Sequence, residues 1–427
     1  MAALLPLVLW SPAIAGEREG AVTGKDAVLQ RFVHDAVAGN AAVLAAQAAL
    51  RGDTERRAGA VRSYDNPELS IHNEEIGAFD SDGHQSERRF VISVAGRLDL
   101  HGKRRARISV AEARRLVAEA DLDRVRVDVA AELLNALGLW RTASDRARLM
   151  ATQEENMADF EALAERRRQA GDISRMEADL ATLALAETRM RRAAVEAERS
   201  VAEEGVRNVT FADNEQGWPV LGFDLPSLGE VPLDRVATLP VVRAALLRAQ
   251  VADAEVGAAR RDRRPDPTVS LGVGREAGAG LAEIGVSVPL AVLDRGVHAV
   301  SAATADAAAA ARTGDDVLRR ARVRFEASAE RYRIARRAWQ EWLRDGAGSL
   351  GQREALARRS WEAGELEPAD YLVHLDAAME LRVQALELRH AAWTAWFEWL
   401  AASGGLDDWL GMRANVGREA TGDGGGM

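Results

Sequence analysis

The chain contains 427 residues, carries a net charge of −10 and has no cysteine. Its length allows two or three domains, but 5% aromatic and 29% charged residues favour extended helices with narrow apolar seams over one thick core. The acidic balance, with arginines interleaved among acidic residues, argues against nucleic-acid binding. A chain without cysteine forms no disulfide bond.

The first residues predict an export signal. Residues 1–10 are mainly apolar and Ala13-Ile14-Ala15 is a small-x-small cleavage site, so we expect a signal peptide at 1–15. No later run of about 18 apolar residues exists, which argues against a membrane-spanning helix. Entry into a membrane would then require a closed barrel of strands, because only helices and barrels satisfy their backbone groups in lipid.

Three motifs recur in one order and at nearly one spacing, which indicates a duplicated unit. The motif pairs are 66–70 with 266–270, Gly102 with Gly296, and 170–173 with 363–366. We therefore expect a first repeat at 16–207, an inter-repeat linker at 208–235, a second repeat at 236–403 and a disordered glycine-rich tail at 404–427.

Each unit is expected to begin with a helix, at about 26–60 and 239–263, followed by two strands. Apolar residues then alternate with polar ones, as in a half-buried strand. This pattern predicts one hairpin at about 68–100 and another at about 268–292. The expected strands are 68–77, 89–100, 268–275 and 281–292. Strands of about ten residues suit a tilted membrane strand.

Two very long helical hairpins follow the strands. Between Lys103 and about Gln169 there is no proline, and apolar residues recur at steps of three or four, which indicates a coiled-coil seam. The second unit matches from about His298 to Ala363, with a glycine-rich interruption at 346–351. The tryptophans near the C-terminus lie on a helix and a tail, so we expect packing between helices: Trp393, Trp396, Trp399 and Trp409.

Four strands cannot close a barrel, and an open sheet edge in lipid leaves backbone groups unsatisfied. Several protomers must therefore build one barrel together. Three copies would supply twelve strands, and a cyclic homotrimer is a common closed symmetry. Other closed rings remain compatible with the sequence.

This order of elements, over about residues 26–402, resembles the TolC-like outer-membrane efflux proteins. Three motifs resemble the Czc-type (cobalt-zinc-cadmium) heavy-metal branch: 66–70, 98–104, and 288–290 with 294–296. His101 departs from that branch, which usually has glycine there. The resemblance implies a mainly α fold with β, built from a duplicated unit of helix, β-hairpin and long coiled-coil helical hairpin. It also implies four strands per protomer in a trimeric, 12-stranded outer-membrane β-barrel continuous with a periplasmic α-helical barrel.

The resemblance further implies an exit duct in a tripartite efflux system of the resistance-nodulation-division type, exporting divalent heavy-metal cations across the outer membrane of a Gram-negative bacterium. The expected partners are two further copies of the chain, a periplasmic adaptor protein, indirectly an inner-membrane proton-driven pump, and outer-membrane lipid. The same duct could instead serve multidrug efflux or type I protein secretion.

The family places adaptor docking and the gate at the periplasmic tips of the helical hairpins, where a glycine is followed six positions later by an acid. The implied tip residues are Gly171, Ser174, Glu177, Gly364, Glu365, Asp370 and Tyr371. The glycines permit a tight reversal between helices, and the acids can bond across protomers or attract cations. Tyr371 either joins these tip contacts or packs between helices.

No pattern in the sequence indicates catalysis. HExxH, Ser/His/Asp and paired-carboxylate signatures are absent. Gly272-Val273-Gly274 follows a strand but opens no helix, so a hairpin is favoured over a nucleotide loop. The His and acidic residues of the first hairpin lack metal-ligand spacing, which favours a solvated loop. We expect no enzyme activity, no cofactor and no resident metal.

Overall fold

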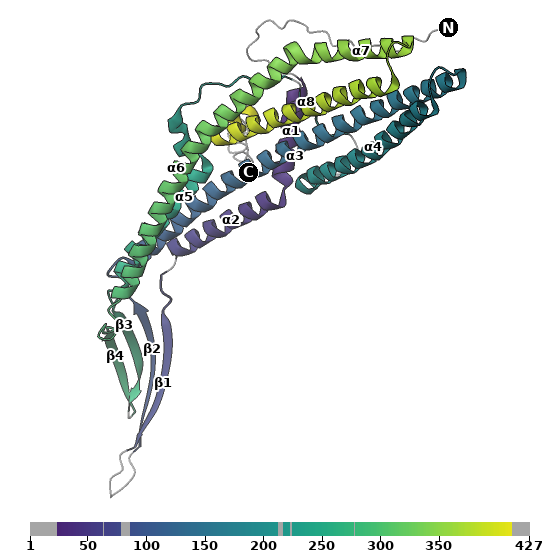
Figure 1. The fold of residues 1–427 in the computed structure, drawn as a ribbon. Coiled ribbons are helices and arrows are strands. Elements are labelled where there is room, and N and C mark those ends of the chain that lie inside the picture. The colour runs from purple at the N-terminus through teal and green to yellow at the C-terminus, as the bar shows by residue number, and fades with distance from the viewer. Residues whose placement is uncertain are drawn as a thin grey trace, which may run out of the picture.

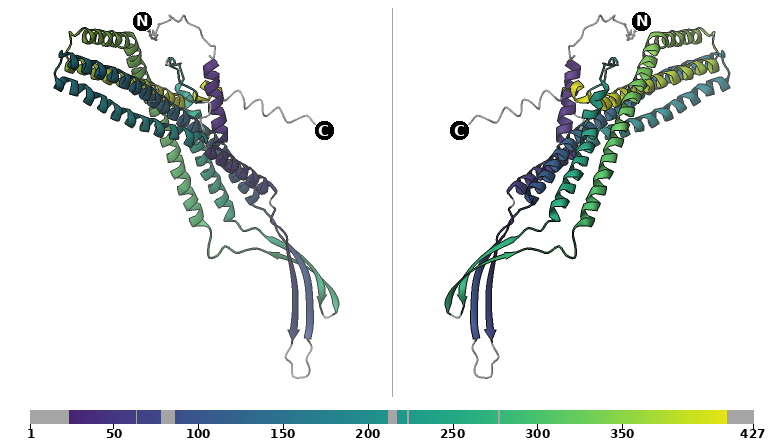
Figure 2. Two further views of the ribbon diagram at one scale, coloured as in Figure 1. Left: turned by 90° about the vertical axis from the view of Figure 1, so that its right-hand side faces the viewer. Right: turned by 90° about the vertical axis from the view of Figure 1, so that its left-hand side faces the viewer.

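The computed structural model describes residues 24–62, 64–77, 86–211, 217–222, 224–276 and 278–411. The expected signal peptide at 1–15 and most of the expected tail lie outside these residues. The chain is elongated, with a four-stranded sheet at one end and the tips of two helical hairpins at the other (Figure 1). The two perpendicular views show the same arrangement (Figure 2).

The first helix is divided in two, contrary to the single helix expected at about 26–60. Helix α1 spans Gly24–Gly39 and helix α2 spans Ala41–Arg62. Asn40 lies between them and is buried. Its Oδ1 accepts a hydrogen bond from the Ala42 backbone N–H at 2.9 Å, and its Nδ2 donates to the Val209 carbonyl at 3.0 Å. The amide thereby begins a new helix at α2, because short polar side chains satisfy the first free N–H groups.

The sheet contains β1 (Glu68–Gly77), β2 (Ser86–Arg97), β3 (Thr268–Glu276) and β4 (Ala279–Ser287). The order is β1-β2-β3-β4 and every pair is antiparallel, so β2 and β3 join the two predicted hairpins.

Strands β2 and β4 end earlier than expected. The Asp99 carboxylate accepts hydrogen bonds from the backbone N–H groups of Lys103 and Arg104, both at 2.8 Å, which makes 98–102 a helix-initiating turn. After β4, Pro289 cannot donate to a ladder.

The two faces of the sheet differ in chemistry. The register aligns Ile71 with Ile92 and Ile92 with Val273 on one face. The exposed apolar residues of this face are Leu69, Ile71, Phe90, Ile92, Val94, Leu271, Val273, Ile284 and Val286. The opposite face is small and polar. On that face the Glu283 side chain lies over Gly272, where an added Cβ would be 2.7 Å from the Glu283 Cγ. The Glu283 carboxylate forms an ion pair with Arg89 at 2.7 Å.

Helices make up the rest of the described structure. They are α3 (Lys103–Ala170), α4 (Arg175–Thr210), the 3-10 helix η1 (Leu233–Thr238), α5 (Pro240–Asp262), α6 (Val297–Glu341), the π-helical turn η2 (Trp342–Gly346), α7 (Ala347–Ala363), α8 (Pro368–Ser403) and α9 (Leu406–Trp409). No described helix is both long enough and apolar enough to cross a membrane.

The helix from α6 to α7 is interrupted earlier than the glycine-rich run predicts. The interruption is the π-helical turn at 342–346, whereas Gly348 and Gly351 are helical. The Trp342 ring lies against Gly346, where an added Cβ would be 2.3 Å from the indole. Gly346, which leaves room for the Trp342 ring, therefore lies where the helix changes to π geometry. The glycine content of the segment does not by itself show where this change occurs.

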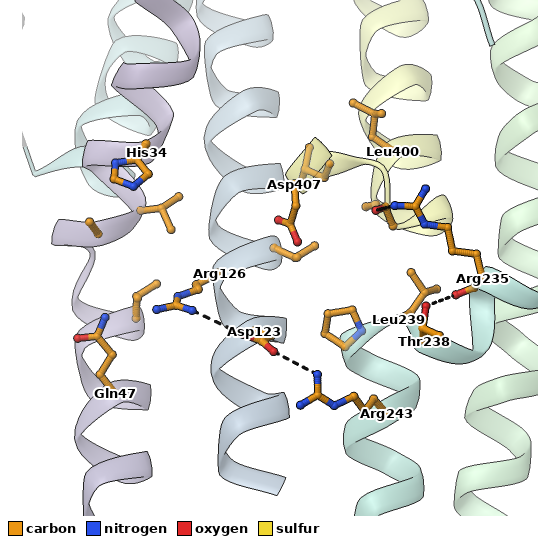
Figure 3. A pocket seen from close by; sticks show the side chains of 18 residues that line it. His34, Gln47, Asp123, Arg126, Arg235, Thr238, Leu239, Arg243, Leu400 and Asp407 are labelled. Atoms are coloured by element: carbon orange, nitrogen blue, oxygen red, sulfur yellow. Dashed lines mark hydrogen bonds and ion pairs between the residues drawn. The ribbon is translucent and has the colours of Figure 1, made fainter. Parts of the chain in front are cut away.

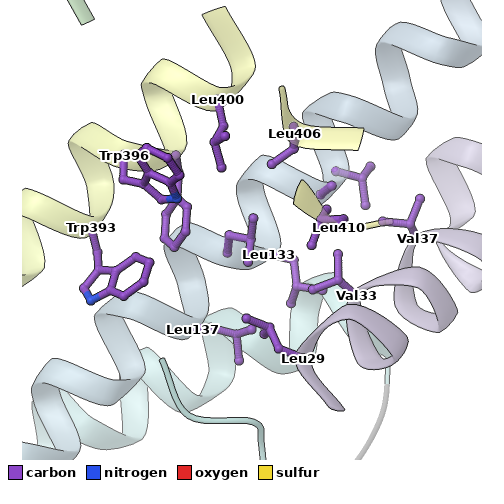
Figure 4. Close-up of a cluster of buried hydrophobic side chains, with 14 of the residues drawn as sticks. Leu29, Val33, Val37, Leu133, Leu137, Trp393, Trp396, Leu400, Leu406 and Leu410 are labelled. Carbon is purple, nitrogen blue, oxygen red and sulfur yellow. The ribbon is translucent and has the colours of Figure 1, made fainter. Parts of the chain in front are cut away.

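The main core lies midway along the molecule, where α1, α3, α8 and α9 meet (Figure 4). The predicted packing of Trp393, Trp396 and Trp399 between helices is confirmed, since all are buried. The expected disorder from 404 onward is wrong for residues 404–411. Gly404 ends α8 with a φ of 68°, and the chain turns back to bury Leu406 and Leu410, which removes two apolar side chains from water.

The linker between the repeats is packed against this core over part of its length. Helix α4 extends to Thr210, past the boundary expected at 207. Trp218 is buried, and its ring meets the Trp140 ring edge-on at a centroid distance of 5.1 Å. The Trp393 indole donates a hydrogen bond to the Gly222 carbonyl at 3.2 Å. Buried aromatic rings thus hold the linker to α3 and α8.

Candidate functional site at the helical tips

Both helical hairpins reverse through a left-handed glycine at the same end of the molecule (Figure 1). Gly171 has a φ of 83° and Gly364 a φ of 79°. In the first hairpin the Gly171 N–H donates to the Arg168 carbonyl and the Asp172 N–H to the Arg167 carbonyl. The second hairpin repeats this pair of bonds around Gly364. Such paired bonds satisfy the last carbonyls of a helix and need a residue that tolerates positive φ.

Ser174 and Glu177 form a capping box at the start of α4. The Ser174 N–H donates to the Glu177 carboxylate at 2.6 Å, and the Glu177 N–H donates to the Ser174 Oγ at 3.3 Å. Hydrogen bonds from the side chain and the backbone of Ser174 to the carboxylate lower the pKa of Glu177. Within one protomer, the predicted tip acid therefore stabilises its own helix terminus.

The second tip presents two exposed acids. Glu365 follows Gly364, and Asp370 lies in the first turn of α8 after Pro368. A carboxylate there interacts favourably with the helix dipole. Asp370 makes no ion pair or hydrogen bond through its side chain with any residue in the described ranges. Of the predicted tip acids, Asp370 is thus the one most accessible to another molecule.

Tyr371 is a packing residue. Its side chain is 4% exposed and its ring stacks on Trp361 at a centroid distance of 5.6 Å and an interplanar angle of 10°. Phe160 of the first hairpin lies 5.3 Å from the same ring. Burial raises the pKa of the Tyr371 hydroxyl, partly opposed by the Arg358 guanidinium. Of the two roles left open for Tyr371, the structure places it between helices.

Arg167, which no motif in the sequence marks, connects the two hairpins. Its Nη2 donates to the Trp361 carbonyl at 2.6 Å and to the Glu362 carbonyl at 3.1 Å. Its guanidinium carbon also lies 4.3 Å from the Trp361 ring centroid. The sequence places Arg167 in the last turn of α3, where a cation complements the carbonyl groups of its own helix end. In the structure Arg167 binds the end of α7 instead.

A cavity of about 620 Å³ lies elsewhere, between α2, α3, α5 and the end of α8 (Figure 3). Its carboxylate Asp123 faces two arginines, with Arg126 at 3.6 Å and Arg243 at 3.5 Å. Burial raises the pKa of Asp123, and the two arginines act in the opposite direction. At Asp123 the lining thus presents a carboxylate paired with two cations, and Asp407 and His34 line the same cavity.

Part of the chain matches a known protein family. Residues 32–210 match the family described as outer membrane efflux protein. A relative, the cobalt-zinc-cadmium resistance protein CzcC of Cupriavidus metallidurans, is 31% identical over 234 residues, or 53% of this chain and 55% of that protein. The match therefore spans about half the length of that relative.

Solved structures share the fold of this chain. The outer-membrane channel OprN has a TM-score of 0.76 at 21% identity, covering 90% of this chain and 92% of that one. CusC, described as forming a transmembrane channel, has a TM-score of 0.74 at 14% identity, covering 88% and 92%. The predicted fold class is thus confirmed, and so is the resemblance to the Czc-type branch.

The Glu177 capping box predicts a pH-dependent tip. Because the folded pKa of Glu177 is lowered from 4.5, the stabilisation is present above that pH and is lost as pH falls through the lower, folded pKa. We expect amide hydrogen exchange at 174–180 to accelerate, relative to intrinsic rates, between about pH 5 and pH 3. Glu177→Gln keeps both capping bonds without a titrating group, so its relative protection should not change. Equal acid sensitivity in both proteins would contradict this role.

Proposed function

We propose that this protein is the outer-membrane channel of a tripartite efflux system that exports divalent heavy-metal cations, acting as a passive duct rather than as an enzyme. The observation that carries the proposal is the exposed apolar face of the sheet, where Leu69 is 64% and Ile284 is 79% exposed. Apolar residues in cross-strand rows at this exposure are costly in water but favourable against lipid. The small, polar opposite face suits a water-filled interior.

The edges of the sheet support a ring of protomers. Strands β1 and β4 each have one neighbour within the described chain, so each leaves a row of backbone groups unpaired. In lipid these groups require strand partners. In the proposed homotrimer, β4 of one copy pairs with β1 of the next, and twelve strands close one barrel.

The tips are the proposed docking and gating region for the adaptor protein. The left-handed glycines shape both reversals, and the exposed Glu365 and Asp370 offer carboxylates to a partner of opposite charge. Through the adaptor the duct would meet an inner-membrane, proton-driven pump. Divalent cations are the proposed cargo because of the similarity to the cobalt-zinc-cadmium resistance protein.

The decisive experiment is the growth limit of a deletion strain, with and without the restored gene, across Zn, Co, Cd, Ni, Cu and a panel of drugs. We expect the deletion to lower tolerance to one or more of the metals alone, with tolerance regained on restoration. The empty vector is the matched control. Unchanged metal limits together with new drug sensitivity would overturn the proposed cargo while retaining the duct.

A further inference from the structure

We infer that the junction between the strands and the helices is a binding site for the phosphate headgroup of an anionic phospholipid. The inference rests on the proposed outer-membrane location and adds a lipid class and a site to it. At this junction β2 leads into α3, α5 leads into β3 and β4 leads into α6 (Figure 1). These three connecting segments are 97–107, 260–266 and 290–296, and Asp65 lies in a fourth, which joins α2 to β1.

The junction is strongly basic in a protein that is acidic overall. The three segments contain ten Lys or Arg residues and four Asp residues, although the whole chain has a net charge of −10. The basic residues are Arg97, Lys103, Arg104, Arg105, Arg107, Arg260, Arg261, Arg263, Arg264 and Arg295. A surplus of cations where a sheet with an apolar face ends is suited to anionic headgroups.

Several of these cations have no carboxylate partner. Arg295 and Arg264 are exposed and make no side-chain ion pair within the described ranges. Among the described residues, Arg263 donates to the Arg295 carbonyl at 2.9 Å, whereas Arg97 forms a long ion pair with Asp65 at 4.0 Å. Lys103 is instead neutralised by the buried Asp266 at 3.1 Å. The arginines therefore retain donors for an external anion, and a planar guanidinium fits phosphate oxygens well.

A cavity collects these groups. It has a volume of about 520 Å³, and its lining contains four cations, Arg97, Lys103, Arg263 and Arg295, together with three aspartates, Asp262, Asp266 and Asp294. Asp266 binds Lys103, and the Asp294 carboxylate accepts a hydrogen bond from the Gly296 N–H at 2.7 Å, so the lining keeps a surplus of one positive charge. Beside the cavity, Leu290 is 80%, Val292 70% and Leu293 99% exposed. Arginines next to protruding apolar side chains match a molecule with an anionic head and an apolar body, which describes a phospholipid better than free phosphate.

The test is titration of the full-length, detergent-solubilised protein with dilauroyl phosphatidylglycerol or dilauroyl phosphatidylcholine, with bound lipid counted by native mass spectrometry. We expect phosphatidylglycerol to bind about tenfold more tightly. Arg97→Gln/Arg263→Gln/Arg295→Gln should abolish that preference. The matched control is Arg312→Gln/Arg322→Gln/Arg324→Gln, which removes three exposed arginines from α6 and should keep it.

A second variant tests the apolar half without removing charge. Leu290→Ser/Leu293→Ser should weaken both lipids several-fold while the preference for phosphatidylglycerol remains. A preference that survives the junction triple variant, or that the control triple variant also loses, would overturn the inference. Displacement of phosphatidylglycerol by inorganic phosphate would assign the site to free phosphate instead. If metal tolerance and outer-membrane fractionation are normal while the preference is absent, this inference fails and the proposed function stands.

Discussion

Replacing Trp361 with alanine is expected to loosen both helical tips together. Trp361 is 2% exposed, stacks on Tyr371, contacts Phe160 at a centroid distance of 5.0 Å and lies under the Arg167 guanidinium. Truncating a buried aromatic side chain of this size costs about 3–5 kcal/mol, because it removes apolar burial and leaves a cavity. The loss should fall on the aromatic cluster of Phe160, Trp361 and Tyr371, which joins the first hairpin to the second.

The measurement is amide hydrogen exchange of the full-length protein, resolved by peptide. We expect faster exchange at 157–167 and 357–375 and unchanged exchange around the core at 129–137. Leu356→Ala on the same helix is the matched control, because Leu356 is 58% exposed and its truncation should be nearly neutral. Faster exchange confined to the second hairpin would show that Trp361 does not connect the two.

Valine at Gly171 or Gly364 is expected to abolish metal tolerance while trimers persist. Both glycines occupy left-handed backbone, which costs a residue with a Cβ about 1–2 kcal/mol and a β-branched residue more. At Gly171 no atom lies within 4 Å of an added Cβ, so the effect would come from the backbone rather than from a clash. The reversal should change shape, and the docking surface with it.

Gly348→Val separates this effect from the general cost of valine in a helix. Gly348 is exposed, lies within α7 and has no atom within 4 Å of an added Cβ, so tolerance should stay close to that of the parent protein. Tolerance is read from growth limits on metal, and assembly from migration of the unheated membrane fraction. Full efflux by Gly171→Val and Gly364→Val would refute the assignment of the tips to docking.

Local periodicity was sufficient to predict most elements. Helix α3 follows from proline-free steps of three and four, and β1 begins and ends where its alternation does. The errors have a common origin. The helix break at Asn40 depends on a bond to Val209, and the order of 404–411 depends on burial of Leu406 among distant helices. Contacts between segments far apart in sequence leave no period to detect.

The candidate site likewise contains residues that the sequence identifies and contacts that only the fold reveals. The glycines at 171 and 364 were recognisable in the sequence because only left-handed reversals need them at a helix end. Glu177 was also recognisable, but its capping bond to Ser174, rather than a contact with another protomer, became evident only from the fold.

By itself the sequence determined the duplicated plan, the amphipathic strands and the position of both tips, since each depends on residues that are neighbours along the chain. Only the tertiary structure decided that Tyr371 packs inside and that Arg167 reaches the end of α7. Burial and long-range hydrogen bonds depend on which segments meet, and the two hairpins meet through side chains from separate repeats.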